Sequence, residues 1–381
     1  MWCNNIKSIR YINSSQNAHP FIQKATHSPH KTSQNHTTSS MPIFIPSNNR
    51  KHHLKNVLAH GLESTVTIHP INYTYTINKD ISSHLSFSII GMSKTGTTSL
   101  LKLLQNKTAI IPKERCDLVI DDVPLLLNTL YNIEQQTNLP TGLKCPQDMS
   151  SEKSIHNYKQ YFYKTKLIIG LRHPIWWFES LYNFNVRNMN SMIKTDKLER
   201  CVRGSHGVCA WRTNIVDFVS RLNKTPMGDD EQKYLALKGK QQEGEVGPVF
   251  LYDVNQLEES IGGVSDAFRR DLADFLGVDG ELPEIPHIST AGVLDFIPGA
   301  KEFSEDLMID ICDEQHSFIR GVLMEKAKNS SEWIRKYFIQ SKDVRVSSKD
   351  YFVKRLEEWI VDPCIERRRR TKSKADIITA T

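Results

Sequence analysis

The sequence predicts a three-layer α/β domain in which a central, mostly parallel sheet is flanked by helices. Two short apolar runs, Lys166 to Leu171 and Val249 to Tyr252, have the composition of strands that are buried on both faces of such a sheet. Helical patterns follow both runs, and strands that alternate with helices are typical of parallel sheets. We therefore expect one α/β domain that extends from about residue 85 to residue 345.

A third strand and helix, separated by a glycine turn, carry the most informative local pattern. An apolar strand from Phe87 to Ile90 leads into a turn that contains Gly91 and Gly96, and a helical pattern begins at Thr97. In this order the N–H groups of the turn and of the helix N-terminus converge on one point, where the helix dipole favours negative charge. The segment therefore predicts a phosphate-binding loop within a P-loop-like fold.

The remaining elements are predicted from apolar periodicity and from residues that begin or end helices. Pro174 suits a first helical turn because its missing N–H has no partner there. Ser265 and Ser304 suit helix starts, and Gly277 suits a helix end. The expected elements are a strand at 109–111, helices at 174–188, 265–276 and 305–327, and a short helix at 256–260. The polar segment 190–247 is expected to form loops over the site.

Both ends of the chain are expected to lie outside this domain. Residues 1–62 contain no Asp or Glu but seven of the fourteen His. No periodic apolar pattern persists there, so residues 1–84 are predicted to form a disordered or loosely attached leader. The leader resembles an organelle transit peptide, and a lumenal stem is the alternative. We therefore favour the Golgi lumen or another organelle over the cytoplasm, and we expect residues 346–381 to form a C-terminal helix and a basic tail.

Composition and cysteine spacing argue against several functions. No run of about 18 apolar residues occurs, so the sequence as given predicts no membrane span. The net charge of +6 arises from 49 basic and 43 acidic residues, and the basic run Arg367 to Arg370 is typical of a solvated end rather than a nucleic-acid site. The seven cysteines include no C-x-x-C pair, which argues against a zinc site and a dense disulfide scaffold. For Cys201 and Cys209 a disulfide and two free thiols are the alternatives, and we favour free thiols.

The glycine turn differs from an NTP-binding loop in the position of its lysine. The step from Gly91 to Gly96 matches the Walker A pattern G-x-x-x-x-G-K-[ST], but Thr97 stands at the lysine position and the lysine is Lys94. An NTPase places that lysine on the β- and γ-phosphates and requires Mg²⁺. A P-loop kinase or NTPase is therefore an alternative, and we find no strand that clearly ends in an acid for Mg²⁺.

With its lysine inside the turn, the segment GMSKTGTTSLLKLL resembles the loop with which sulfotransferases hold 3′-phosphoadenosine 5′-phosphosulfate (PAPS). The resemblance implies PAPS as co-substrate and no metal. It assigns the 5′-phosphosulfate to five loop residues, Lys94, Thr95, Gly96, Thr97 and Thr98. In this reading Lys94 neutralises charge on the leaving phosphate.

A second anion site is expected because PAPS also carries a 3′-phosphate. Arg172 follows the strand at 166–171, and Ser180 lies eight residues later in the next helix. This arrangement resembles the Arg and Ser of the sulfotransferase 3′-phosphate motif. An arginine can bind a phosphate through two parallel hydrogen bonds, and a serine hydroxyl adds an uncharged one. His173 neighbours the arginine, and we expect it to serve packing rather than catalysis.

Sulfuryl transfer usually also needs a base that removes a proton from the acceptor. The segment IIPKE, which ends at Glu114, resembles the Lys-Glu pair of carbohydrate-type sulfotransferases, so Glu114 is the expected base. The segment GLKCPQDM resembles their Lys-x-Pro segment and places Lys144 beside the transferred sulfate. The Arg-Lys-Gly segment with which cytosolic sulfotransferases cover the 3′-phosphate is not found.

For other polar and aromatic residues near these segments we expect only solvent exposure or burial. Asp148 and the acidic cluster Asp117, Asp121 and Asp122 are expected to be solvated rather than to contact an acceptor. Trp176 and Trp177 have faces that suit stacking on sugars, yet at least one of them is expected in the core.

Taken together, the resemblances imply a sulfotransferase, more like the carbohydrate-type branch than the small-phenol branch, that moves the sulfuryl group of PAPS to a hydroxyl or amine of a carbohydrate or another small acceptor. The alternatives are a P-loop kinase or NTPase and a catalytically silent nucleotide-binding module. No nucleic-acid partner is expected. No pattern identifies the acceptor or the oligomeric state.

Overall fold

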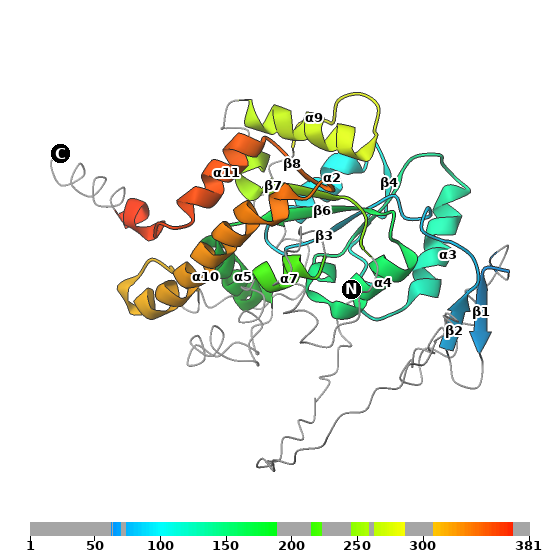
Figure 1. Cartoon of the computed structure of the whole chain (residues 1–381), viewed down its shortest axis with the longest axis horizontal. Coiled ribbons are helices and arrows are strands. Elements are labelled where there is room, and N and C mark those ends of the chain that lie inside the picture. The colour runs from blue at the N-terminus through cyan, green and yellow to red at the C-terminus, as the bar shows by residue number, and fades with distance from the viewer. Residues whose placement is uncertain are drawn as a thin grey trace, which may run out of the picture.

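The centre of the described part of the chain is a six-stranded parallel sheet with the strand order β4-β5-β3-β6-β7-β8. Helices flank this sheet on both faces (Figure 1). This computed structural model describes residues 62, 64–69, 74–188, 215–222, 245–258, 263–285 and 308–368. The strands are β3 (Phe87–Gly91), β4 (Ala109–Ile110), β5 (Thr141–Lys144), β6 (Lys166–Leu171), β7 (Val249–Asp253) and β8 (Val344–Val346). The expected α/β fold with a mostly parallel central sheet is confirmed.

Side chains that alternate along the strands build a hydrophobic layer on each face of the sheet. Phe87 and Ile89 of β3 join one cluster, and Ile90 joins the other. The first cluster includes α2 (Thr97–Leu104) and α9 (Val264–Leu276), with Phe268 at 0% exposure. The second cluster includes side chains of α3 (Val123–Glu134), α4 (Glu152–Tyr161), α5 (Pro174–Asn188), α7 (Ile215–Ser220), α10 (Ser317–Lys336) and α11 (Lys349–Glu358). Burial on both faces explains why the central strands read as continuous apolar runs.

Packed structure begins earlier in the chain than residue 85. The strands β1 (Val66–His69) and β2 (Thr74–Ile77) pair in an antiparallel hairpin. Val66 and Tyr75 are buried in the second hydrophobic cluster, and the Tyr75 ring lies 6.4 Å from that of Tyr161 on α4. The expectation of a loosely attached leader over residues 1–84 therefore does not hold for the hairpin. Alternating apolar side chains of the hairpin anchor it to the domain. Residues 1–61 lie outside the described residues.

Several element boundaries also differ from expectation. Helix α10 begins at Ser317 rather than near residue 305, and Ser304 lies outside the described residues. The short helix after β7 is a 3₁₀ turn, η4 (Val254–Leu257). The predicted strand β6 and helix α5 occur with the expected bounds, and Gly277 ends α9 in the left-handed region with φ 72°. Within the segment 190–247, α7 and residues 245–247 are among the described residues.

Among the described residues, two disulfides close loops that the cysteine pattern did not reveal. Cys116 bonds to Cys145 across 29 residues, and Cys312 bonds to Cys364 across 52 residues. By the chain-entropy model, disulfides that close loops of these lengths stabilise the fold by about 3–5 kcal/mol each. Cys201 and Cys209 lie outside the described residues. Among the helices that the structure describes, none is long and apolar enough to cross a membrane.

Candidate functional site

The candidate site lies at the carboxyl edge of the sheet, where open α/β sheets bind ligands. β3 leads into the loop 91–97, β5 ends at Lys144, and β6 is followed by Arg172. The strand order places β3 between β5 and β6, so these three strand ends are neighbours. The structure therefore brings the loop, Lys144 and Arg172 to one edge of the sheet.

Two glycines of the loop are required by their surroundings. A Cβ atom on Gly91 would lie 2.7 Å from Met149 Sδ. Gly96 has φ +81°, and a Cβ atom there would lie 2.1 Å from Leu257 Cδ1. Gly96 is thus fixed both by its left-handed backbone and by the close approach of η4.

Four side chains hold four successive carbonyl groups of the loop. Three of these side chains lie outside the loop: one is on α5, one belongs to the residue after β6, and one is on β7. The bonds run from Thr95 Oγ1 to the Met92 carbonyl (2.6 Å), from Trp177 Nε1 to Ser93 (2.7 Å), from Arg172 Nη1 to Lys94 (3.3 Å) and from Tyr252 OH to Thr95 (2.7 Å). In a trans peptide each N–H points away from the carbonyl of the preceding residue, so each N–H group of residues 93–96 points away from the side chain that holds that carbonyl. Loop N–H groups of this kind can form an anion-binding concavity.

Lys94 lies inside this loop in an unusual backbone conformation. Its φ of 66° is in the left-handed region, and its Nζ atom lies 4.2 Å from the centroid of the Phe184 ring on α5. The aromatic face stabilises the ammonium group by a cation–π interaction. The lysine that the sequence singled out is therefore part of the loop itself and near α5.

Glu114 and Lys144 form an ion pair next to the start of α2. Lys144 Nζ lies 3.0 Å from Glu114 Oε2 and 3.4 Å from Thr98 Oγ1. The lysine side chain is only 7% exposed, whereas that of Glu114 is 44% exposed. The structure thus brings together three of the residues that the sequence proposed separately, with the carboxylate on the solvent side.

Covalent and backbone bonds hold this pair in place. The Cys116–Cys145 disulfide joins the residue two places after Glu114 to the residue after Lys144. The Arg115 N–H donates to the Lys144 carbonyl at 3.1 Å, and the Cys145 N–H donates to Ile89 of β3 at 3.1 Å. The segment that carries Glu114 is therefore fixed to the edge of the sheet.

Arg172 reaches the loop from the end of β6, and Ser180 lies on α5. Ser180 is half-buried, three residues after Trp177 and four before Phe184, so the three share the helix face that meets the loop. Among the described residues no hydrogen bond joins Arg172 to Ser180. Burial lowers the pKa of Arg172, and the negative charge of Glu179 opposes that shift.

His173 is part of the packing, as expected. It is 6% exposed, its Nδ1 accepts a hydrogen bond from the Ile175 N–H at 3.2 Å, and its ring packs edge-on against Trp359. Burial, with a contribution from Arg355, lowers the pKa of His173 to about 3. The imidazole is therefore neutral at physiological pH.

The expectation that the nearby acids are solvated was wrong for three of them. Asp148 is 0% exposed, and Asp117 and Asp121 are each 6% exposed. Asp117 pairs with Arg115, and Asp121 accepts a hydrogen bond from Asn157 Nδ2. These acids are internal because side chains of their own segment and of α4 supply partners.

Asp148 is the most deeply buried of these acids. Its Oδ2 accepts a hydrogen bond from Tyr158 OH at 2.8 Å, and its Oδ1 is buried with no partner among the described residues. Tyr158 OH also lies 2.8 Å from Ser88 Oγ of β3. Burial raises the pKa of Asp148 to about 7, and the charges of Asp117 and Glu114 add to the increase.

A strand that ends in an acid does exist, contrary to the sequence expectation. β7 ends at Asp253, which is 1% exposed. Its carboxylate caps η4 by accepting from the Asn255 N–H at 3.0 Å, and it lies 3.9 Å from Arg355 Nε. Burial raises the pKa of Asp253. Within the described residues no group of three or more His, Cys, Asp or Glu is placed to hold a metal ion.

The sequence identified the loop and the strand ends but did not predict that side chains hold the loop carbonyls. Thr95 and Arg172 were expected as anion ligands only. Trp177 is 2% exposed and belongs to the core, which confirms the expectation for one of the two tryptophans. Its indole N–H also supports the loop, a role that its position just after Arg172 could have suggested. The role of Tyr252 could not be predicted in this way, because the sequence indicates only that Tyr252 belongs to a buried strand.

Comparisons with known proteins give a similarity at the level of structure. No family model matches the chain, and no curated protein matches it. The chain resembles the crystal structure of a sulfotransferase from Alicyclobacillus acidocaldarius with a TM-score of 0.38 and 18% sequence identity, over 66% of this chain and 96% of the other.

Replacing the buried acid, Asp148→Asn, should change how stability depends on pH. The folded pKa of about 7 exceeds the ordinary value of 3.8, so the folded state retains a proton that the unfolded state has lost. The parent protein should therefore lose stability as pH rises from about 4 to about 7. Urea unfolding at several pH values should show that the variant lacks this loss. Parallel stability curves for the two proteins would contradict the assignment.

Removing one loop contact, Tyr252→Phe, should destabilise the protein by about 1–3 kcal/mol, because a buried carbonyl loses its partner. The affinity for inorganic phosphate should fall as well, since the loop is held less firmly. The matched control is Tyr182→Phe, which removes a buried hydroxyl that has no partner among the described residues. Equal urea-unfolding energies and equal phosphate affinities for the two variants would refute the role of Tyr252.

Proposed function

We propose that this protein is a PAPS-dependent sulfotransferase, closer to the carbohydrate-type branch than to the branch that acts on small phenols. One observation carries the proposal above the others. A P-loop-like cradle contains its lysine at position 94 within the loop, and an ion pair of Glu114 and Lys144 adjoins the helix that follows it. These are the parts that transfer of an anionic group to a neutral acceptor requires.

The loop supplies the site for the 5′-phosphosulfate. The N–H groups of residues 93–96 and the N-terminus of α2 offer donors to the phosphate oxygens. Lys94 offsets the negative charge that develops on the 5′-phosphate when the bond from sulfur to its bridging oxygen breaks. The hydroxyl groups of Thr97 and Thr98, on the first turn of α2, are additional donors.

Glu114 is the proposed base. Its carboxylate is held 3.0 Å from Lys144 Nζ yet remains partly exposed, so an acceptor hydroxyl or amine can reach it. Glu114 takes the acceptor proton as the bond between acceptor and sulfur forms. Lys144, which is also within reach of Thr98, neutralises charge on the transferred group and connects the base to the loop.

Arg172 and Ser180 are the proposed site for the 3′-phosphate. Arg172 uses one N–H on the Lys94 carbonyl, and the rest of its donor set remains for an anion. Ser180 lies on the α5 face that also carries Trp177. Recognition of the 3′-phosphate distinguishes PAPS from nucleotides that lack it.

The Cys116–Cys145 and Cys312–Cys364 disulfides support an oxidising compartment, such as the Golgi lumen or another organelle. The proposed acceptor is a glycan or another small molecule, and either an oxygen or a nitrogen atom could receive the group. No nucleic-acid partner is proposed. Arg367 and Arg368 of the basic tail form ion pairs with Glu179 and Glu314, which supports that exclusion.

A P-loop kinase or NTPase is the second candidate, and Asp253 at the end of β7 is the observation that favours it. Against this candidate, Thr97 stands in place of the Walker lysine. The Asp253 carboxylate is also engaged by the η4 backbone and faces Arg355. A catalytically silent nucleotide-binding module is the third candidate.

The function is tested by incubating the full chain with ³⁵S-labelled PAPS and a mixture of glycans, lipids and phenols. We expect transfer of label in the presence of EDTA, and a decrease of roughly 100-fold or more in kcat for Lys94→Ala because a charge-stabilising group is lost. Labelling from [γ-³²P]ATP that EDTA abolishes would support the kinase instead. Tight binding of adenosine 3′,5′-bisphosphate without any transfer would support the silent module.

The proposed base is tested by Glu114→Gln. Transfer should be abolished while the affinity for adenosine 3′,5′-bisphosphate stays nearly unchanged, because glutamine cannot accept the proton but preserves the shape of the side chain. The control is Glu134→Gln, which removes a carboxylate that pairs with His84 at 2.7 Å on another part of the domain. If the Glu114→Gln variant retains turnover by the labelled-transfer assay, the base is another group.

A further inference from the structure

Two neighbouring faces of α5 make different contacts. Trp177 and Phe184 contact the loop, and Ser180 lies between them in the sequence. The next face carries Trp176, Glu179 and Asn183, which are three or four residues apart. This second face is covered by residues 308–312 and by the C-terminal segment 362–368, which are far from α5 in the sequence.

Residues 308–312 follow the second face through backbone contacts. Asn183 Nδ2 donates to the Ile309 carbonyl at 2.9 Å, and the Ile309 N–H donates to Asn183 Oδ1 at 2.9 Å. The Ile311 N–H donates to Glu179 Oε1 at 3.3 Å. One side of α5 is therefore bound to this segment over about one helical turn.

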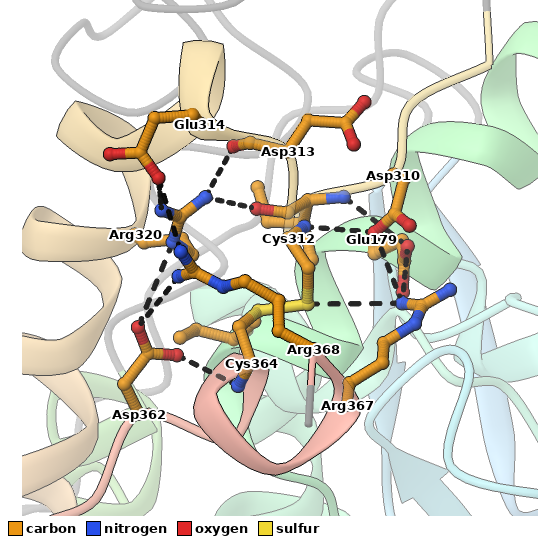
Figure 2. The surroundings of a disulfide bond; sticks show 12 residues. Glu179, Asp310, Cys312, Asp313, Glu314, Arg320, Asp362, Cys364, Arg367 and Arg368 are labelled. Carbon is orange, nitrogen blue, oxygen red and sulfur yellow. Dashed lines mark hydrogen bonds and ion pairs between the residues drawn. A yellow bond between two sulfur atoms is a disulfide. The ribbon is translucent and has the colours of Figure 1, made fainter. Parts of the chain in front are cut away.

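Arg367 neutralises Glu179 from the C-terminal segment. Arg367 Nη1 lies 3.2 Å from Glu179 Oε1 and 3.2 Å from Asp310 Oδ1. Figure 2 shows Arg367 directed toward both carboxylates. The guanidinium carbon also lies 5.4 Å from the centroid of the Trp176 ring. Glu179 is only 17% exposed, so its charge is more strongly felt by its neighbours than that of a surface carboxylate.

The C-terminal segment is fixed by a covalent bond as well as by charge. The Cys312–Cys364 disulfide joins it to residues 308–312, and Arg320 lies between Glu314 and Asp362 beside that bond (Figure 2). Cys364 is 0% exposed and Cys312 is 6% exposed. The bond keeps Arg367, three residues after Cys364, near Glu179.

The placement of Glu179 matters because it directly precedes Ser180 on α5, the helix that begins two residues after Arg172. A carboxylate that lost its partner here would repel an anion bound at Arg172 and Ser180, and it would compete for the guanidinium group of Arg172. Among the charges that act on Arg172, Glu179 has the largest effect on the pKa of the guanidinium.

We propose that Arg367 is a positioning residue for nucleotide binding. By neutralising Glu179 and packing on Trp176 it keeps Arg172 available and keeps the face of α5 that carries Ser180 toward the loop. The Cys312–Cys364 disulfide maintains this contact, so its loss weakens binding of the 3′-phosphate. The inference rests on the proposed use of PAPS and adds a residue and a bond outside the loop to that site.

The experiment compares affinities for adenosine 3′,5′-bisphosphate and adenosine 5′-monophosphate by calorimetry. The ratio of these two affinities measures the contribution of the 3′-phosphate. Arg367→Gln should reduce this ratio on the order of tenfold, the effect of one partly screened unit charge. Glu179→Gln combined with Arg367→Gln should restore it, which a loss of packing alone would not allow. The double variant Cys312→Ser, Cys364→Ser should reduce the ratio in the same direction.

Arg335→Gln is the matched control, because Arg335 pairs with Glu357 at 3.1 Å between α10 and α11 and its loss should leave the ratio unchanged. If Arg367→Gln fails to fold, Glu179→Gln alone serves, and it should raise the ratio. An unchanged ratio in Arg367→Gln, no restoration in the combined variant, or a lower ratio in Glu179→Gln would each overturn the inference. If the parent protein shows no preference for the bisphosphate, the proposed function fails, and this inference fails with it.

Discussion

The site depends on the orientation of the peptide groups in the loop after β3. Four carbonyl groups in succession accept hydrogen bonds from side chains, and three of the donors come from α5, the end of β6 and β7. A loop of this kind would otherwise satisfy its carbonyls with water and sample several orientations. Because each of these carbonyls already has a side-chain partner, the loop peptides are oriented before a ligand binds, which lowers the ordering cost of binding. The sheet, through the neighbouring strands β3, β6 and β7, places these donors within reach.

The same edge of the sheet explains why Glu114 and Lys144 meet. Lys144 ends β5, and its side chain is buried, so its charge requires a partner. Glu114 provides that partner from a segment with no regular secondary structure, and the Cys116–Cys145 bond restricts how far this segment can move. An exposed ion pair would contribute little, but here one partner is buried and the other is covalently restrained. The pair can therefore keep its geometry while the Glu114 side chain remains partly exposed to solvent.

The sequence predicted the fold where local signals and burial agree. Strands β6 and β7 are continuous apolar runs, and Pro174 and Gly277 mark helix boundaries, so these elements were predicted. β5 was not predicted because its sequence, Thr-Gly-Leu-Lys, contains no apolar run; its Gly142 makes room for the Phe87 ring of β3. The elements α3, α4 and β8 were not predicted either. The candidate residues lie at the predicted edge, but neither their contacts nor the disulfide pairs follow from local spacing. The Lys144–Glu114 contact joins residues 30 positions apart and the Arg172 bond to Lys94 joins residues 78 positions apart, so only the packed sheet defines them.

The left-handed backbone conformation of Lys94 is informative about the role of the loop. The left-handed region costs a residue with a Cβ atom about 1 kcal/mol, and glycine would occupy it without that cost. The loop already has glycine at 91 and 96, yet it has a lysine with φ 66° between them. Two contacts help to offset this conformational cost. Arg172 donates a hydrogen bond to the Lys94 carbonyl, and the Lys94 ammonium group contacts the Phe184 ring. Strain that is held in place at a binding loop suggests that the side chain is needed there. A cation at this position suits an anionic group that is transferred from within the cradle better than the terminal phosphate of a nucleoside triphosphate, which the Walker lysine reaches from the first turn of the helix.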